Sequence, residues 1–453
     1  MFHHKSRKII TFCLLITLVF LSTITFSIIL QNQSAIATED IDWNRLIKDK
    51  NFAETVHKVE KRWEKEYEDY FSQNLADFSL KAEDIAKTLT KLSQETATKP
   101  AVIWVYPVKK QLQLLIITSG KKPKLYSIKD ANQATLTEVV KKLKSEVTQP
   151  TNPTAKSYLK PAQKLYNWII KPLESTLKSE KIDTLIFCLG SGLRTIPLVT
   201  LHDGEKFLIE KYSITRIPAF NLLKTDYNPI KNAQILAMGA STFSQLESLP
   251  AVPLELDEIT KIWAGKRFIN QQFTIKNLQQ QRQKQHFRII HLATHAEFKP
   301  GKPNQSYIQL WGNEKIRLNE IEKLKLDQPP VDLLVLSACK TALGDQEAEL
   351  GFAGLTVKSG VKSVLASLWN VSDLGTMALM IEFYENLQKI PLKAEALRQA
   401  QIAMLTGKVT MESGKLQGSR GDLPLPSELA KLADANFSHP FYWSAFTMIG
   451  NPW

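Results

Sequence analysis

The segments Phe287-Arg-Ile-Ile-His-Leu-Ala-Thr-His295 and Val331-Asp-Leu-Leu-Val-Leu-Ser-Ala-Cys339 decide the fold of this chain. Each is a short apolar run rich in Ile, Val or Leu, which is typical of a strand buried on both faces of a sheet. One run ends in a histidine and the other in a cysteine. In open α/β sheets, the chemistry gathers at the carboxyl ends of the strands. These two ends are therefore the first place to look for a functional site.

Similar apolar runs recur along the chain and alternate with helical patterns. They lie at 184–189, 235–238, 289–293, 333–336 and 364–367. Shorter runs at 102–106, 112–118 and 125–128 are separated by Lys, Gly and Pro and predict a meander that borders a larger sheet. Alternation of this kind predicts the α/β class, with a mainly parallel sheet flanked by helices on both faces.

The region before the sheet is predicted to be helical. Phe52, Val56, Val59 and Trp63 recur at helical spacing, and a second amphipathic stretch with Leu80, Ile85 and Leu89 follows. We therefore divide the chain into a helical N-terminal region, 38–97, and a sheet domain, 98–453.

The first 37 residues resemble an export signal. Lys5, Arg7 and Lys8 precede residues 9–30, which carry no charge, and Ala35-Ile-Ala37 follows as a small-residue cleavage site. The apolar stretch is also long enough to anchor the chain in a membrane. Both interpretations leave the basic residues in the cytoplasm. They predict that the body is periplasmic, extracellular or held at the outer face of the membrane.

Composition limits the choice of partners. The formal net charge is +13, but it is spread thinly. The most basic tract that could bind nucleic acid, Gln279-Gln-Gln-Arg-Gln-Lys-Gln285, has the pattern of a solvated helix face. We therefore predict no nucleic-acid partner. The three cysteines, Cys13, Cys188 and Cys339, form neither a disulfide framework nor a metal-binding spacing, and Cys188 is predicted to belong to the core.

His295 and Cys339 are candidate catalytic partners. If their strands are neighbours, the imidazole can take the thiol proton and generate a thiolate nucleophile. Taken alone, each has a simpler interpretation. A cysteine at the end of a buried strand is often a small apolar filler, and a strand histidine can be a hydrogen-bonded core residue. A zinc site shared by His291 and His295 is disfavoured, because residues four apart on a strand are about 13 Å apart.

Several motifs in order resemble the CHAT family, a bacterial branch of the caspase-like clan that includes caspases and separases. They are Gly190-Ser-Gly-Leu-Arg-Thr-Ile-Pro197, Leu201-His-Asp-Gly204, His291-Leu-Ala-Thr-His295-Ala-Glu-Phe, Leu336-Ser-Ala-Cys339-Lys-Thr-Ala-Leu-Gly344, Ser367-Leu-Trp-Asn-Val-Ser-Asp373 and His439-Pro-Phe-Tyr-Trp-Ser-Ala-Phe-Thr-Met-Ile-Gly450. The resemblance covers roughly residues 100–453. It implies a caspase-like fold and peptide-bond hydrolysis by a His/Cys pair without a cofactor or metal.

The resemblance also assigns roles to individual residues. It implies that His295 is the base, that Cys339 is the nucleophile and that His291 is a supporting or core residue. The backbone N–H groups of Cys339 and Ala296 would form the oxyanion hole. Ala296 stands where many relatives carry glycine.

Asp373 has two competing interpretations. In separases, an aspartate in a similar segment lines the pocket for a basic P1 residue, and a carboxylate there would pair with Arg. Alternatively, Asp373 caps a helix that begins at Leu374. Trp369 and Trp443 are predicted to be packing residues.

The sequence therefore predicts a cysteine endopeptidase that acts on protein or peptide substrates, with a possible preference for a basic P1 residue. The alternative is a catalytically inactive caspase-fold module that binds a partner protein, because a fold does not guarantee activity.

Overall fold

The computed structural model describes residues 41–75, 79–148, 156–341, 343–432 and 434–453, and at positions 338 and 339 only the main chain. The chain divides into two compact units, Met1–Asp49 and Lys50–Trp453. In the first unit the described part contains one helix, α2 (Trp43–Asp49). The segment at 9–30 that resembles an export signal or anchor lies outside the described residues. Among those that are described, no helix is long and apolar enough to cross a membrane.

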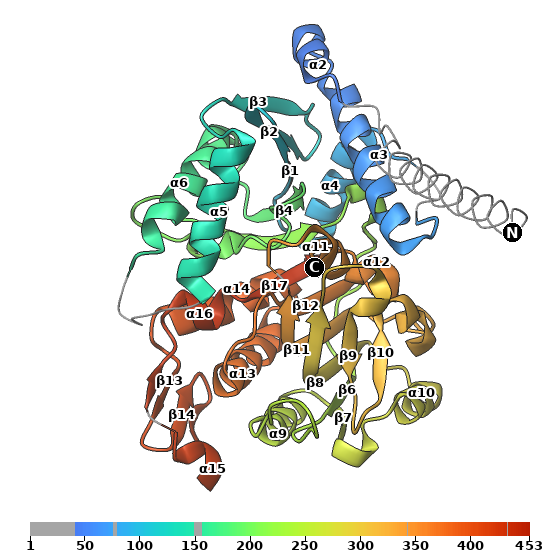
Figure 1. Ribbon diagram of the computed structural model, residues 1–453, viewed down its shortest axis with the longest axis vertical. Helices are drawn as coiled ribbons and strands as arrows, with labels where there is room; N and C mark the ends of the chain where they lie inside the picture. The colour runs from blue at the N-terminus through green and yellow to red at the C-terminus, as the bar shows by residue number, and fades with distance from the viewer. Residues whose placement is uncertain (1–40, 76–78, 149–155, 342, 433) are drawn as a thin grey trace, which may run out of the picture. The chain divides into compact units, whose positions relative to one another are not determined.

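The second unit is built on one large mixed sheet (Figure 1). Its strands are β1 (Pro100–Val108), β2 (Gln111–Thr118), β3 (Lys124–Ile128), β4 (Thr184–Leu189), β5 (Ser213–Ile217), β6 (Ile235–Gly239), β7 (Gly265–Ile269), β8 (Ile289–Phe298), β9 (Tyr307–Gln309), β10 (Lys315–Arg317), β11 (Leu333–Thr341), β12 (Ser363–Ser367) and β17 (Phe446–Gly450). The predicted runs all form strands, and the predicted meander β1–β2–β3 borders the sheet as expected.

The strand order is β10-β9-β8-β11-β12-β17-β5-β4-β1-β2-β3, with β7 and β6 joined to the first half of β8. Strands β6, β7, β8, β11 and β12 are mutually parallel. Strands β17, β5, β4 and β1 form a second parallel set. The two sets meet where β12 and β17 pair in antiparallel fashion. The predicted mainly parallel sheet is therefore confirmed, but its two halves run in opposite directions.

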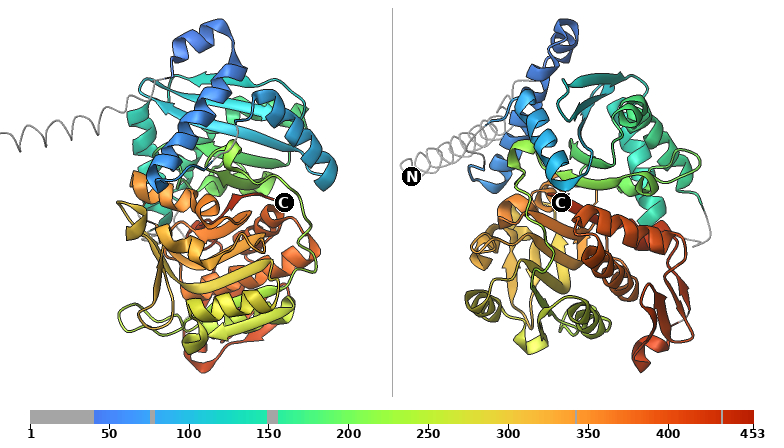
Figure 2. Two further views of the ribbon diagram at one scale, coloured as in Figure 1. Left: turned by 90° about the vertical axis from the view of Figure 1, so that its right-hand side faces the viewer. Right: turned by 180° about the vertical axis from the view of Figure 1, so that it is seen from behind.

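Helices cover both faces of this sheet (Figure 2). The longer ones are α3 (Phe52–Phe71), α4 (Ala82–Thr96), α5 (Gln133–Thr148), α6 (Leu159–Ile169), α9 (Val252–Ile262), α10 (Ile275–Lys284), α11 (Gln346–Ala353), α13 (Asp373–Lys389) and α14 (Lys393–Leu405). Shorter helices are α7 (Glu174–Ser179), α8 (Leu208–Lys211), α12 (Leu355–Ser359), α15 (Ser427–Ala430) and α16 (Pro440–Trp443). Around β8 and β11, helices α9 and α13 pack on one face, and α11 packs on the other.

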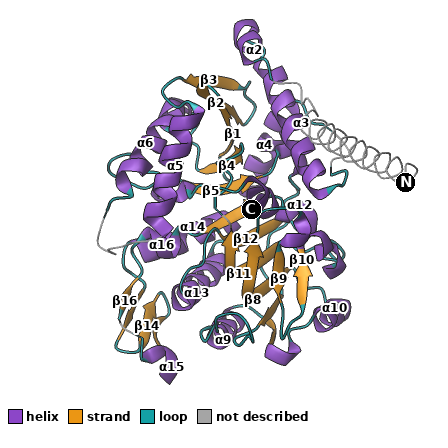
Figure 3. Ribbon diagram, viewed as in Figure 1, coloured by secondary structure: helices purple, strands orange, loops and turns teal. Residues whose placement is uncertain are grey.

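A small second sheet lies beside α13 and α15 (Figure 3). Its strands are β13 (Thr410–Glu412), β14 (Lys415–Gly418), β15 (Gly421–Pro424) and β16 (Ala435–Asn436), in the order β15-β14-β13-β16. The hairpin β14–β15 turns through Ser419 and Arg420, with Gly418 paired with Gly421. Gly421 has a φ of +88°, a conformation that favours glycine.

Helices α3 and α4 share the core of the sheet. Tyr67 and Phe71 of α3 belong to the main hydrophobic cluster. The buried carboxylate of Glu60 accepts hydrogen bonds from the Trp104 indole at 2.5 Å and from the main-chain N–H of Asn221 at 2.9 Å. The helices predicted for 38–97 are present, and α3 and α4 lie in the same compact unit as the sheet.

One surface expectation holds only in part, since Gln280, Gln283 and Lys284 are exposed but Arg282 is not. Helix α10 contains most of the Gln279–Gln285 tract, which was expected to be a solvated face. Arg282 is instead buried, and it donates hydrogen bonds to the carbonyls of Lys325 and Pro329. Because its charge is used to satisfy main-chain groups within the fold, this residue is not part of a basic surface.

Candidate active site at the end of β8 and β11

Strands β8 and β11 are parallel neighbours, so the two candidate catalytic residues lie on adjacent strands. The register pairs Ala338 with His295 and Cys339 with Ala296. His295 and Cys339 are thus diagonal neighbours, whose Cα atoms are roughly 6 Å apart at ordinary strand spacing. The register shifts by one residue between Leu336 and Ala338, which is a bulge just before the pair.

Neither residue is the last of its strand, which differs from the expectation. Strand β8 continues to Phe298 and β11 to Thr341. The extension is held by β9, which pairs with β8 at Ala296, and by the packing of Phe298 against Phe352 of α11. Ala296 is part of this ladder and is not among the residues with positive φ, so alanine is accommodated there without strain.

His295 is oriented by the 240–251 loop, which connects β6 to α9. Its Nε2 lies 2.7 Å from the carbonyl oxygen of Glu247. A carbonyl can only accept a hydrogen bond, so Nε2 carries the proton and Nδ1 is the basic nitrogen of the neutral ring. The ring of Phe243 lies 4.8 Å away, centre to centre. The side chain is half-buried, and an imidazole fixed in this way can serve as a general base.

The 240–251 loop is itself closed by main-chain hydrogen bonds. The N–H of Ala240 donates to the carbonyl of Ala293 on β8 at 3.1 Å, and the N–H of Leu249 donates to the carbonyl of Ser241 at 2.8 Å. Ser241 is held in turn by the Asn270 side chain. The loop is therefore attached to the strand that carries His295.

Asp373 binds the other end of the same loop. Its carboxylate accepts a hydrogen bond from the N–H of Ala251 at 2.5 Å. Burial raises the pKa of Asp373 to about 7, and the nearby charges of Glu255 and Glu247 act in the same direction, whereas the Ala251 N–H opposes them. Asp373 and His295 thus contact one loop from two elements, α13 and β8.

The capping interpretation of Asp373 is wrong. Helix α13 begins at Asp373 itself, and its N-cap is Ser372, whose hydroxyl accepts a hydrogen bond from the N–H of Gly375 at 3.1 Å. The carboxylate of Asp373 does not cap α13, because it accepts its hydrogen bond from the N–H of Ala251 in the 240–251 loop.

His291 is a core residue, as one interpretation of the sequence suggested. It is fully buried between α9 and α13, where Nε2 lies 2.7 Å from the Glu255 carboxylate and Nδ1 lies 3.1 Å from the Tyr384 hydroxyl. Both ring nitrogens are therefore occupied by protein groups. No group of three or more potential metal ligands is found within the described ranges.

The other singled-out residues are structural. Cys188 is buried in β4, and burial raises the pKa of its thiol, which disfavours a thiolate there. Trp369 and Trp443 are buried, and their indole N–H groups donate to the carbonyls of Phe441 and Ser438. The predictions of core and packing roles for these three residues are confirmed.

Sequence reasoning missed the 240–251 loop. The groups that contact His295 and Asp373 are a carbonyl and an N–H of the main chain, which every residue carries. The side chain of Phe243 was the only residue-specific signal in this contact, and a lone aromatic in a loop predicts nothing by itself.

Comparison with solved structures finds distant similarity. Two chains of the Saccharomyces cerevisiae separase–securin complex, at 2.6 and 3.0 Å resolution, align with 83% of this chain at 12% identity, with TM-scores of 0.41 and 0.42. A chain of the Porphyromonas gingivalis RgpB pro- and mature-domain complex aligns with 71% of this chain and 77% of its own length, at 12% identity and a TM-score of 0.38. The present chain spans about a third of the separase chains, 32% and 31%.

A search of curated proteins finds no match. The CHAT domain model matches residues 159–451. The match begins later than the resemblance expected from about residue 100, so α3, α4 and the meander β1–β3 precede it. It includes β4, both candidate catalytic residues, Asp373 and β17. Because this match covers well over half of the 453 residues, the chain belongs to the CHAT domain family.

Proposed function

We propose that the protein is a cysteine endopeptidase in which His295 is the general base and Cys339 is the nucleophile. The observation that carries the proposal is the direct pairing of β8 with β11, together with an imidazole whose Nε2–H is held by the Glu247 carbonyl. This hydrogen bond leaves Nδ1 as the nitrogen that can accept the thiol proton. Membership of a family with a caspase-like fold supports the same chemistry.

In the proposed reaction, His295 removes the proton of Cys339 and the thiolate attacks the scissile carbonyl carbon. The C–N bond then breaks, and the imidazolium gives its proton to the leaving amine. Water, deprotonated by His295, attacks the thioester and releases the carboxylic acid and the free thiol. The main-chain N–H groups of Cys339 and Ala296 are the proposed oxyanion donors.

The register between β8 and β11 means that the proposed dyad requires a local change in the strands. In a parallel ladder, directly paired residues point to the same face, and His295 is paired with Ala338 rather than with Cys339. The proposed dyad therefore needs a local departure from the regular pleat at residues 338–340. The oxyanion donors also have to leave the ladder, because Cys339 and Ala296 are paired residues within it.

We further propose that Asp373 selects a basic P1 side chain. A carboxylate pairs well with guanidinium or ammonium groups, and a half-buried one such as Asp373 gains from such a partner because less water competes for it. The hydrogen bond from Ala251 places Asp373 at the loop that also binds His295. Glu247 and Glu255 add negative charge around it.

Export is a separate proposal, supported by the Lys5 to Ala37 pattern alone. The basic residues followed by an uncharged stretch are typical of a secretory signal or signal anchor. The body of the protein, and hence its protein or peptide substrate, would then lie outside the cytoplasm.

A catalytically inactive interaction module is the second candidate. It is favoured by the ladder that continues past both residues, since paired main-chain groups are not available as oxyanion donors. The peptidase needs the Cys339 thiol as its nucleophile, whereas the interaction module does not need this thiol.

The deciding experiment uses an Arg chloromethyl ketone peptide and mass spectrometry, alongside a peptide-library cleavage profile. We expect one adduct, at Cys339, in the wild type and in Cys188→Ala, the matched control that removes a buried thiol. Cys339→Ala and His295→Ala should lose the adduct and the cleavage, by at least about 100-fold. Cleavage by Cys339→Ala at the wild-type rate would eliminate the peptidase proposal.

A further inference from the structure

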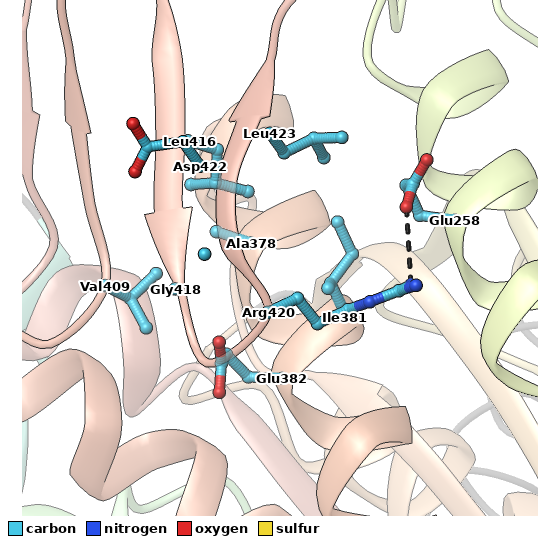
Figure 4. Close-up of a pocket in the computed structure, with 11 residues that line it drawn as sticks. Glu258, Ala378, Ile381, Glu382, Val409, Leu416, Gly418, Arg420, Asp422 and Leu423 are labelled. Atoms are coloured by element: carbon cyan, nitrogen blue, oxygen red, sulfur yellow. Dashed lines mark hydrogen bonds and ion pairs between the residues drawn. The ribbon is translucent and has the colours of Figure 1, made fainter.

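A pocket lies between α13 and the β14–β15 hairpin, and neither His295 nor Asp373 lines it (Figure 4). Its volume is about 170 Å³. Ala378 and Ile381 of α13 and Leu416 and Leu423 of the hairpin give it an apolar lining. A pocket of this size and lining suits a short aliphatic chain.

A buried carboxylate also lines this pocket. Glu382 lies one turn along α13 from Ala378, and its side chain is only 3% exposed. Its Oε1 accepts a hydrogen bond from the N–H of Ser419 at 2.7 Å. No described residue hydrogen-bonds to its other oxygen. A Cβ at Gly418 would lie 2.6 Å from Oε1, so glycine is what allows the hairpin to approach this carboxylate so closely.

Arg420, the cation that lines this pocket, forms ion pairs with other carboxylates. Arg420 lies at the hairpin turn, and its guanidinium contacts Glu385 at 3.1 Å and Glu258 at 3.4 Å. Asp422 pairs with Lys415 at 3.3 Å. Glu382 has no ion pair among the described residues. The second oxygen of Glu382 is thus open to a cationic partner that enters the pocket.

We propose that this pocket binds a positively charged group on an aliphatic stem, an alkylammonium or an alkylguanidinium. The stem would pack against Ala378, Ile381 and Leu416, and the charged end would meet the free oxygen of Glu382. Such a group is carried by Lys and Arg side chains of a peptide and by free alkylamines. Strand β15 is an edge of the small sheet, so an extended peptide could pair with it while inserting a side chain.

The pocket is distinct from the proposed P1 site. Glu382 follows Asp373 by nine positions on one helix, which is about 14 Å along the axis. The proposal also does not depend on catalysis. Its test can therefore use the full chain with Cys339→Ala and Asp373→Asn. These substitutions remove the proposed nucleophile and the proposed P1 carboxylate.

The experiment is a calorimetric titration of that full-length background with n-pentylammonium and n-butylguanidinium, and with n-pentanol as the uncharged analogue. We expect one cation bound per chain and no binding of n-pentanol. Glu382→Gln should weaken cation binding at least about 10-fold. Glu412→Gln, at an exposed position of β13 outside the pocket, should leave cation binding unchanged. Equal binding of n-pentanol, or unchanged binding by Glu382→Gln, overturns the proposal.

Two further variants distinguish loss of the binding site from loss of the fold. Arg420→Ala removes the competing cation of the rim and should tighten binding about threefold or more, a gain that a damaged fold cannot produce. Leu423→Trp, at a half-exposed edge position, should fill the pocket and abolish binding. An unchanged affinity in both variants contradicts a site in this pocket.

A last arm identifies the source of the cation. If acetyl-Gly-Lys-Gly-amide binds more tightly than n-pentylammonium, the site takes a basic peptide segment, and pairing with β15 adds to the affinity. If only the free amine binds, the site takes a small alkylamine. Binding of neither overturns the proposal.

Discussion

His291 and His295 lie four residues apart on β8 and have different environments. His291 is enclosed, with Glu255 and Tyr384 on its two nitrogens. His295 is half-buried, and its ring contacts the 240–251 loop through Glu247 and Phe243. One histidine therefore stabilises the core, and the other is available for chemistry.

Substitution separates these two roles. His291→Ala removes the partner of Glu255, whose second carboxylate oxygen already lacks a hydrogen bond within the described part of the chain. We expect the free energy of unfolding to fall by about 3–5 kcal/mol, because a buried charge is left unpaired. His295→Ala, the matched control, should cost less than about 1 kcal/mol. Chemical denaturation measures both, and equal losses would contradict the assignment.

Asp373 should make recognition of a basic P1 residue dependent on pH. Its pKa is raised to about 7 in the folded protein, so the charge that attracts the substrate is present above that pH and lost below it. We expect kcat/KM for an Arg substrate to rise through about pH 7. Asp373→Asn should lose this rise and the preference for Arg over norleucine, and a pH profile of both proteins tests it.

The raised pKa of Asp373 also makes the free energy of unfolding depend on pH. A carboxyl with a raised pKa keeps its proton in the folded state after the unfolded chain has lost it, so stability falls as the pH rises from about 4 to 7. Above pH 7, Asp373→Asn should therefore be more stable than the wild type, by roughly 1–3 kcal/mol. A variant that is less stable at pH 8 would argue against a buried, destabilising charge at this position.

At the scale of elements, the 240–251 loop links β8 to α13. It binds His295 through the Glu247 carbonyl and Asp373 through the Ala251 N–H. A substrate cation that pairs with Asp373 competes with the Ala251 N–H for the same carboxylate. Recognition at Asp373 and orientation of His295 are thus connected through one segment.

Ala251→Pro tests this connection. Ala251 has a φ of −79°, which the proline ring permits, but it is fully buried and follows Pro250 in a turn closed by the hydrogen bond from the Val252 N–H to the Leu249 carbonyl, so proline also strains this turn. Proline has no N–H to donate. The hydrogen bond that lowers the pKa of Asp373 is lost. We expect that pKa to rise by about one unit, as measured by carbon-13 NMR of the Asp373 carboxyl. An unmoved titration would contradict the role of the loop.

At the scale of the whole molecule, the helices before the family match belong to the fold. Val56, Val59, Trp63, Tyr67 and Phe71 on α3 are buried. Each buried side chain of this size contributes about 1.5–3 kcal/mol. Their sum is comparable with the entire stability of a typical domain, about 5–15 kcal/mol.

Truncation should therefore have two different outcomes. A chain of residues 50–453 retains the whole second unit, and we expect one cooperative unfolding transition. A chain of residues 98–453 lacks α4, which packs on β1 and β2, and α3, whose Trp63 stacks on Tyr106 of β1. It should aggregate or unfold without cooperativity. Circular dichroism and size exclusion distinguish the two, and a stable 98–453 fragment would show that α3 and α4 are dispensable.

The sequence by itself determined the strands, the mainly parallel sheet, the core role of Cys188 and the family. Local apolar runs and short sequence motifs predict these features, because both depend on residues that are close in the sequence. The adjacency of β8 and β11 and the enclosed position of His291 came from the tertiary structure. The reversal of direction between β12 and β17, the extension of β8 and β11 past His295 and Cys339 and their diagonal register were decided only in the tertiary structure. Strand direction and register depend on long-range main-chain pairing, as do the contacts of the 240–251 loop, and a main-chain carbonyl or N–H is the same in almost every residue.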